Sequence, residues 1–134
     1  MANKILLEIV TPEKKVLSET VDIVVAPGEE GEFGALPNHI PFVSKLKVGE
    51  LRFRVGANTQ SVAIMGGYAE VLPDRVTILA SAAEVAGEID IMRAKAARER
   101  AERRMAEAKD RYAFVTAQAA LQRAMARLKI AERR

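Results

Sequence analysis

The stretch EIDIMRAKAARERAERR, residues 88–104, places many arginines among alanines. With one that follows shortly after it, they are Arg93, Arg98, Arg100, Arg103, Arg104 and Arg111. A guanidinium group presents a planar fork of N–H donors that fits a phosphate or a carboxylate. The stretch therefore suits a solvated helix face, a nucleic-acid clamp, a protein-docking surface or a site for nucleotide phosphates. Residue types alone favour the solvated face.

The sequence offers few residues for other kinds of site. There is no cysteine, and His39 is the only histidine, so we find neither a metal-binding cluster nor a nucleophile with a base. The phosphate loop G-x-x-x-x-G-K-[ST] is also absent, so a nucleotide site would differ from a P-loop. We expect no catalytic residues, no metal, and a chain that is not itself an enzyme.

A change of composition near Gly87 predicts two domains. Every glycine lies at or before Gly87 and every proline at or before Pro73, whereas thirteen alanines follow Gly87. Residues 1–86 carry eight basic and eleven acidic side chains, a net charge of −3, and residues 87–134 carry thirteen and seven, a net charge of +6. Because glycine and proline punctuate turns whereas alanine and arginine favour helix, we place the domains at 1–86 and 87–134.

Alternation with a period of two predicts β-strands in the first domain. The alternating apolar residues are Ile5, Leu7 and Ile9; Val21, Ile23 and Val25; Leu51, Phe53 and Val55; Val62 and Ile64; Val76 and Ile78. Turn signals between them include Lys47-Val48-Gly49 and Gly66-Gly67, the latter as a bulge or a tight turn. Short connections join antiparallel strands, so we predict an antiparallel β-sandwich or flattened barrel.

The sequence of the second domain predicts a helical hairpin. Its first helix should begin near Glu88 or Ile89, with Glu88 and Asp90 in the first turn, and should end near Lys109. After a break at residues 109–111, the second helix carries an apolar stripe of Phe114, Ala117, Leu121, Met125 and Leu128. The short break predicts an antiparallel pair. Because alanine dominates its seam, the pair should be marginal without a partner and able to open.

Nothing in the sequence predicts direct membrane insertion. No stretch approaches the roughly 20 apolar residues of a membrane span. The N-terminal apolar run is broken at Glu8, unlike the core of a signal peptide. Any association with a membrane is therefore expected through partners.

A β-sandwich followed by an alanine-rich hairpin resembles the epsilon subunit of bacterial F-type ATP synthase. Four stretches carry the resemblance: GEEGEFGALPNHIPF (28–42), MGGYAEVLPDRVTILA (65–80), AAEVAGEIDIMRAKAARERAERR (82–104) and ALQRAMARLKIAE (120–132). Their order and spacing match the family over essentially the whole chain.

The resemblance implies a non-catalytic rotor subunit in the central stalk of a proton-translocating enzyme. The subunit would be peripheral, at the cytoplasmic face of the bacterial cell membrane. Its sandwich would join the gamma subunit to the c-ring. Its helices would pack on the sandwich when folded down, and when extended would reach along gamma toward the alpha and beta subunits and block rotation in the hydrolytic direction.

The resemblance also implies a regulatory ATP site. In Bacillus-like members the motif is Ile/Leu-Asp-x-x-Arg-Ala, and residues 89–94, IDIMRA, match it in full. The implied ATP-binding residues are Glu84, Ile89, Asp90, Arg93, Ala94, Arg100, Arg123 and Arg127. Arg93 and Arg100 are seven residues apart and share a helix face, with Ala96 and Ala97 between them leaving room for a ligand.

The implied roles differ among these residues. Glu84 would lie near the adenine, and Asp90 either supports the fold around Arg93 or contacts the ligand. ATP, with or without Mg²⁺, would be a regulatory ligand that holds the hairpin folded down.

The implied contact with gamma and the c-ring includes Glu32, Asn38 and His39. Glu32 would face the polar loop of the c subunits. Asn38 stands where glycine is common in the family, and since both residues tolerate left-handed backbone, the turn should survive.

Two other functions stay open from the residues themselves. The chain could be a structural adaptor without a functional ATP site. A hairpin of net charge +6 could also bind nucleic acid. Against nucleic acid, glutamates interleave the arginines and no aromatic platform accompanies them, so we expect no such partner.

Overall fold

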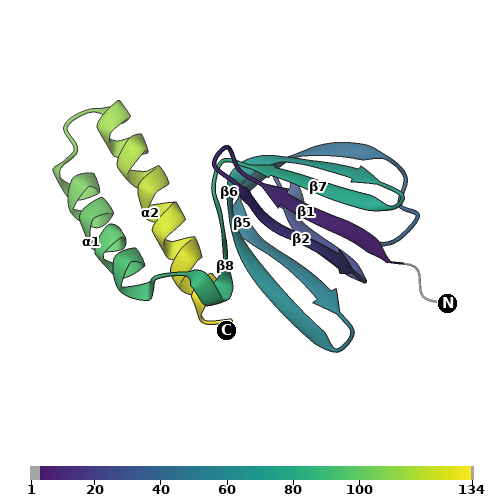
Figure 1. The fold of residues 1–134 in the computed structure, drawn as a ribbon. Coiled ribbons are helices and arrows are strands. Elements are labelled where there is room, and N and C mark those ends of the chain that lie inside the picture. Colours follow the sequence, from purple (N-terminus) through teal and green to yellow (C-terminus); the bar gives the residue numbers. More distant parts are fainter. Residues whose placement is uncertain (1–3, 134) are drawn as a thin grey trace.

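The computed structural model describes residues 4–133 and contains a β-sandwich beside a helical hairpin (Figure 1). The elements are β1 (Ile5–Val10), β2 (Lys15–Val21), β3 (Ile23–Gly28), β4 (Gly31–Ala35), β5 (Phe42–Val55), β6 (Asn58–Leu72), β7 (Arg75–Ala80), β8 (Ala83–Val85), a 3₁₀ turn (Ala86–Glu88), α1 (Ile91–Glu107) and α2 (Arg111–Ala131). This confirms the predicted fold class. In the part of the chain that the structure describes, no helix combines the length and apolar character that crossing a membrane requires.

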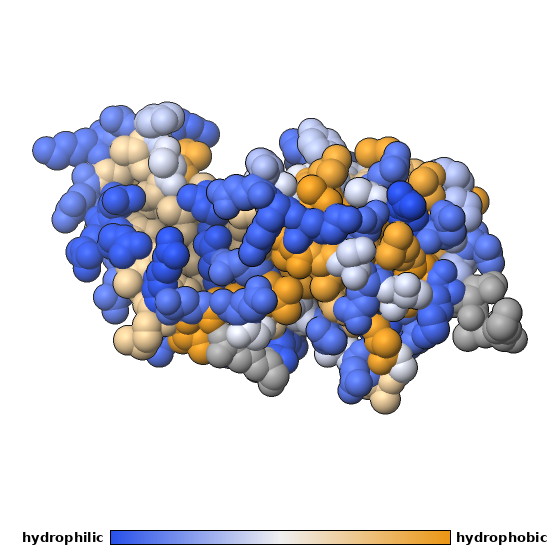
Figure 2. Space-filling view, viewed as in Figure 1, coloured by the Kyte–Doolittle hydropathy of each residue, from blue (hydrophilic) through white to orange (hydrophobic). Residues whose placement is uncertain are grey.

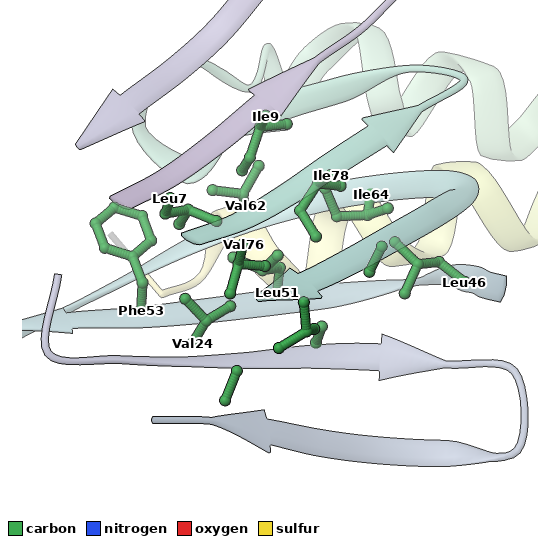
Figure 3. Packing of buried hydrophobic residues seen from close by; sticks show 14 of the residues in the cluster. Leu7, Ile9, Val24, Leu46, Leu51, Phe53, Val62, Ile64, Val76 and Ile78 are labelled. Carbon is green, nitrogen blue, oxygen red and sulfur yellow. The ribbon is translucent and has the colours of Figure 1, made fainter. Parts of the chain in front are cut away.

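The strands enclose one apolar core. They hydrogen-bond in the order β2-β1-β7-β6-β5-β3-β4, and β8 pairs with β6. Leu7, Val24 and Ile78, from three different strands, point into the same interior (Figure 3). The predicted antiparallel pairing holds for most neighbours, but β1 and β7 run parallel. Parallel pairing needs a long connection, and the chain between these two strands provides it.

Two predicted turn signals lie inside long strands. The prediction of a turn at residues 47–49 is wrong, because they belong to β5. Gly66 and Gly67, with φ of 82° and 131°, lie in β6 where its partner changes from β8 to β7. The pairing of β6 with β5 keeps one register on both sides of them, Leu46 with Gly67 and Val48 with Met65, so neither the bulge nor the tight turn is present. A Cβ on Gly67 would lie 2.1 Å from the carbonyl oxygen of Leu79. This glycine therefore permits a close approach between strands.

The alternation predicted at the start of β3 is wrong by one residue. Val24 is fully buried, whereas Ile23 and Val25 on either side of it are half-buried. Asp22 forms a bend between β2 and β3, and its carboxylate accepts a hydrogen bond from the backbone N–H of Gly56 at 2.7 Å. The bend shifts the phase of the alternation.

Both helices begin at an aspartate. The predicted start of α1 is two or three residues too early, since Glu88 lies in the 3₁₀ turn and Asp90 is the N-cap. The Asp90 carboxylate accepts a hydrogen bond from the backbone N–H of Arg93 at 3.0 Å. Asp110 caps α2 in the same way, accepting from Ala113 at 2.8 Å. Each cap satisfies an N–H that the helix leaves without a partner.

The buried positions along the seam of the hairpin are alanines. The predicted stripe on α2 is correct at Ala117, which is buried, and at Leu121 and Leu128, which are half-buried, but wrong at Phe114 and Met125, which are exposed. Buried alanines recur every seven residues, at Ala94 and Ala101 on α1 and at Ala117, Ala124 and Ala131 on α2. A seven-residue repeat keeps one helix face toward its partner, and single methyl groups allow the backbones to approach closely. The apolar area buried per turn is small, as expected from the sequence.

The hairpin is folded down on the outer face of β6. It is held there by a docking cluster of Ala63, Met65, Ala86, Ile89, Ile130 and Ala131. The middle of β6 is consequently buried on both faces, since Val62 and Ile64 belong to the sandwich core while Ala63 and Met65 contact the hairpin. Burying an isoleucine such as Ile130 contributes about 1.5–3 kcal/mol.

Candidate functional site

An open cavity of about 740 Å³ lies between the sandwich and the hairpin. Three parts of the chain line it: the turn between β1 and β2 (residues 11–14), the residues after β7 (81–84), and the facing sides of the two helices. The helices contribute Asp90, Arg93, Ala94, Ala97, Arg100 and Arg127. In the space-filling view, hydrophilic residues cover much of the hairpin and of the strip where it meets the sandwich (Figure 2).

Helix α1 directs two unpaired guanidinium groups to this cavity. Arg93, Ala97 and Arg100 follow one another at four and three residues, so they occupy one face of α1. Both arginines are exposed, and neither forms an ion pair with any residue in 4–133. Ala94 is buried in the seam, and the small side chain of Ala97 leaves space between the two guanidinium groups.

Helix α2 contributes one arginine that is already paired. The Nε of Arg127 donates a hydrogen bond to Oε1 of Glu84 at 2.5 Å. The two side chains are 27% and 37% exposed, and they join α2 to β8 across the cavity. This bond uses one of the five N–H donors of the guanidinium group, so a ligand that contacted Arg127 would share the group with Glu84.

The structure brings together six of the eight residues predicted for ATP. Glu84, Asp90, Arg93, Ala94, Arg100 and Arg127 line the cavity. Ile89 belongs to the docking cluster and is 2% exposed. Arg123 is exposed and is not among the lining residues. It precedes Arg127 by one turn, about 6 Å farther from the docked end of α2.

Sequence reasoning missed the wall that the sandwich provides. It consists of Thr11, Pro12, Glu13, Lys14, Ser81, Ala82 and Ala83. These residues meet because β1 and β7 are parallel, with Val10 beside Leu79, so both strands end at the same edge. No local signal in the sequence indicates that pairing.

Comparisons with known proteins agree with this architecture. The family model for the ATP synthase delta/epsilon chain β-sandwich domain matches residues 4–86, and the model for its long α-helix domain matches residues 88–132. The chain belongs to the ATP synthase epsilon-chain family. It is an epsilon subunit of an F-type ATP synthase, a component of the central stalk that is not an enzyme by itself.

Two bacterial relatives of this epsilon subunit match over nearly their whole length. It is 79% identical over 133 residues to the ATP synthase epsilon chain of Syntrophobacter fumaroxidans, covering 99% of each chain. It is 53% identical over 130 residues to that of Nitratidesulfovibrio vulgaris, covering 97% of each. A chain in the OSCP/F1/c-ring structure of the Euglena gracilis mitochondrial ATP synthase superposes with a TM-score of 0.77 at 27% identity, covering 89% of this chain and 76% of that one.

The residues predicted to contact gamma and the c-ring lie on the sandwich. Asn38 has a φ of 69°, which confirms that the turn tolerates asparagine in a left-handed conformation. The ring of His39 lies 5.1 Å from that of Phe42, centre to centre. Glu32 accepts two hydrogen bonds from the guanidinium group of Arg52, at 3.0 and 3.3 Å. The contact of these residues with other subunits stays a prediction.

A second ion pair joins the epsilon subunit's hairpin to its sandwich. Arg133, after the end of α2, lies 2.8 Å from the Oε2 of Glu50 on β5. The Glu50 side chain is only 10% exposed and also pairs with Arg52 at 3.3 Å. Burial acts to raise the pKa of Glu50, but a hydrogen bond from Ser61 and the charge of Arg133 outweigh it and hold that pKa below its ordinary value.

Replacing Arg133 with alanine is expected to loosen the docked hairpin. The population with an open hairpin should rise about two- to fivefold, as expected for a partly exposed ion pair. Because the pKa of Glu50 is lowered in the folded state, its attraction for Arg133 is complete above the ordinary value of 4.5 and is lost as the pH falls through the lowered folded-state pKa. Hydrogen exchange of the α2 amides at pH 7 and below pH 4.5 measures the effect.

Lys129 provides the matched control, since it is exposed near the end of α2 and forms no ion pair with the residues that the structure describes. Lys129→Ala should exchange like the wild type. If it loosened the hairpin as much as Arg133→Ala, the effect would come from charge near the helix end and not from the pair with Glu50.

Proposed function

We propose that this epsilon subunit joins gamma to the c-ring through its sandwich and restrains ATP hydrolysis through its hairpin. ATP, with or without Mg²⁺, would bind in the cavity between them and hold the hairpin folded down. The observation that carries the proposal is the composition of the cavity. Its lining comes from the sandwich and from both helices, so it exists only while the hairpin is docked. A ligand of such a site stabilises the docked state.

The charges of the cavity suit a nucleotide. Arg93 and Arg100 have no carboxylate partner within residues 4–133, so their N–H donors are available to phosphate oxygens. The carboxylate of Glu84 could accept a hydrogen bond from the adenine amino group. The N–H donors of Arg127 that Glu84 does not use would be available to the phosphates. The cavity, at about 740 Å³, also falls within the size range of small-molecule sites.

Docking on gamma and the c-ring is supported by the surface around Asn38 and His39. Leu36, Ile40 and Val43, which flank these two residues, are 54%, 75% and 68% exposed. Apolar side chains gathered in this way suit an interface with another protein. The Euglena relative belongs to a structure that includes the c-ring. Such docking would place the subunit at the cytoplasmic face of the bacterial membrane, with alpha and beta as partners of the extended hairpin.

Titrating the isolated subunit with ATP, with and without Mg²⁺, tests the regulatory site. We expect saturable binding by calorimetry and a higher melting temperature, because a ligand at 100 times its dissociation constant stabilises the bound state by about 2.7 kcal/mol. The distribution of distances between a label on the sandwich and one on the hairpin should become narrower when ATP binds. An absence of binding at millimolar ATP would leave a structural adaptor without a functional ATP site.

A further inference from the structure

The sandwich contributes a cation to the cavity that no motif in the sequence indicates. Lys14 ends the turn between β1 and β2 and lines the cavity opposite the helices. The turn is closed by its own hydrogen bonds: the backbone N–H of Thr11 donates to the carbonyl of Lys14 at 2.9 Å, and the N–H of Lys14 donates to Oγ1 of Thr11 at 3.3 Å. These bonds hold the backbone of Lys14 at the rim of the cavity.

The ammonium group of Lys14 is uncommitted, unlike that of its neighbour. Within residues 4–133, Lys14 forms no ion pair, whereas Lys15 lies 3.0 Å from the carboxylate of Glu8 and does not line the cavity. The difference follows from position, because successive side chains at the start of a strand point to opposite faces.

The charged side chains that line the cavity have an excess of positive charge, which favours binding of an anion. Arg127 is paired with Glu84, and Asp90 is engaged as the N-cap of α1. The remaining charged lining residues are Lys14, Glu13, Arg93 and Arg100. Three uncommitted cations thus face one uncommitted carboxylate, and two of the cations leave with the hairpin when it opens while the lysine stays on the sandwich.

We propose that Lys14 contacts the phosphates of bound ATP, so that the nucleotide bridges the sandwich and the hairpin. This inference rests on the proposed ATP site and assigns it a residue outside the helical motif. A nucleotide held by the hairpin alone would stabilise the helices whether or not they are docked. Together with the proposed contact to Glu84 on β8, contact with Lys14 makes part of the binding free energy depend on docking, and this coupling is what a regulatory ligand of the folded-down state requires.

The proposal is tested by calorimetric titration of the isolated subunit with ATP and with tripolyphosphate. The wild type is compared with Lys14→Ala and with the control variant Lys15→Ala. Lys14→Ala should weaken the binding of both ligands about two- to fivefold, the effect of losing one exposed charge pair. Lys14→Arg should restore binding, and Lys15→Ala should bind like the wild type. Since Lys14 lies on an exposed turn, the melting temperature without ligand should not change.

Two outcomes separate this inference from the function on which it rests. If Arg93→Ala loses ATP while Lys14→Ala binds it like the wild type, the bridging role of Lys14 is overturned and the ATP site stands. If the wild type binds neither ATP nor tripolyphosphate, the proposed ATP site fails, and the role of Lys14 fails with it.

Discussion

Replacing Arg93 with alanine is expected to weaken ATP binding by the isolated epsilon subunit about tenfold to hundredfold. The loss corresponds to about 1.5–3 kcal/mol, the usual contribution of hydrogen bonds that involve charged groups. Arg93 has no carboxylate partner in the described chain, so its removal takes away a ligand contact and leaves no buried charge behind. The rise in melting temperature that ATP produces should shrink in parallel. Calorimetry and thermal unfolding measure the two effects.

Arg98 provides the matched control on the same helix. It pairs with Glu102 at 3.8 Å and does not line the cavity between sandwich and hairpin. Arg98→Ala removes the same charge from α1 and should leave ATP binding near the wild-type value. If wild type and Arg93→Ala bound ATP equally well, or if Arg93→Ala and Arg98→Ala lost the same affinity, the phosphate-binding role would be contradicted. These arginines would then belong to a solvated or partner-docking face.

Deleting residues 88–134 is expected to raise ATP hydrolysis by the assembled synthase about two- to tenfold and to change synthesis less. The increase reflects an equilibrium between complexes that the extended hairpin blocks and complexes that are active. A twofold rise corresponds to equal populations, and a tenfold rise to a blocked state favoured by about 1.4 kcal/mol. The hairpin has a net positive charge, so in its extended state it could engage acidic surface on alpha and beta. Steady-state hydrolysis by complexes with full-length and shortened subunits measures the effect.

Association with gamma serves as the control for this deletion. The sandwich has its own core, separate from the docking cluster, so the shortened subunit should still co-purify with gamma and the c-ring. An unchanged rate of hydrolysis in such a complex would contradict the regulatory role. Loss of gamma by a shortened subunit that remains folded would instead show that the hairpin, and not the sandwich, makes the contact.

The folded-down hairpin is held by few interactions, and this suits a switch. The buried positions of its seam are alanines, and within residues 4–133 its docking depends on one small apolar cluster and the ion pairs Glu84–Arg127 and Glu50–Arg133. Both ion pairs involve the C-terminal part of α2 or the residues just after it. The free energy of docking is therefore concentrated at one end of the hairpin, where a ligand in the adjacent cavity can add to it.

Local features of the sequence determined the elements of this protein. The strand Ile5–Val10 follows from its alternation, and Ile5, Leu7 and Ile9 are all fully buried. The shift from glycine and proline to alanine near Gly87 marks where strands give way to helices. Such features are readable because side-chain period and turn chemistry depend only on neighbours along the chain.

Tertiary structure alone decided how those elements meet. The parallel pairing of β1 with β7 brings Lys14 to the cavity, and the docking of α2 brings Arg127 to Glu84 while leaving Arg123 outside. The seam follows alanines and not the larger Phe114 and Met125, because close packing of two backbones favours the smallest side chains. Strand partners and helix faces are set by contacts between segments far apart in sequence, and no local pattern records which segments those are.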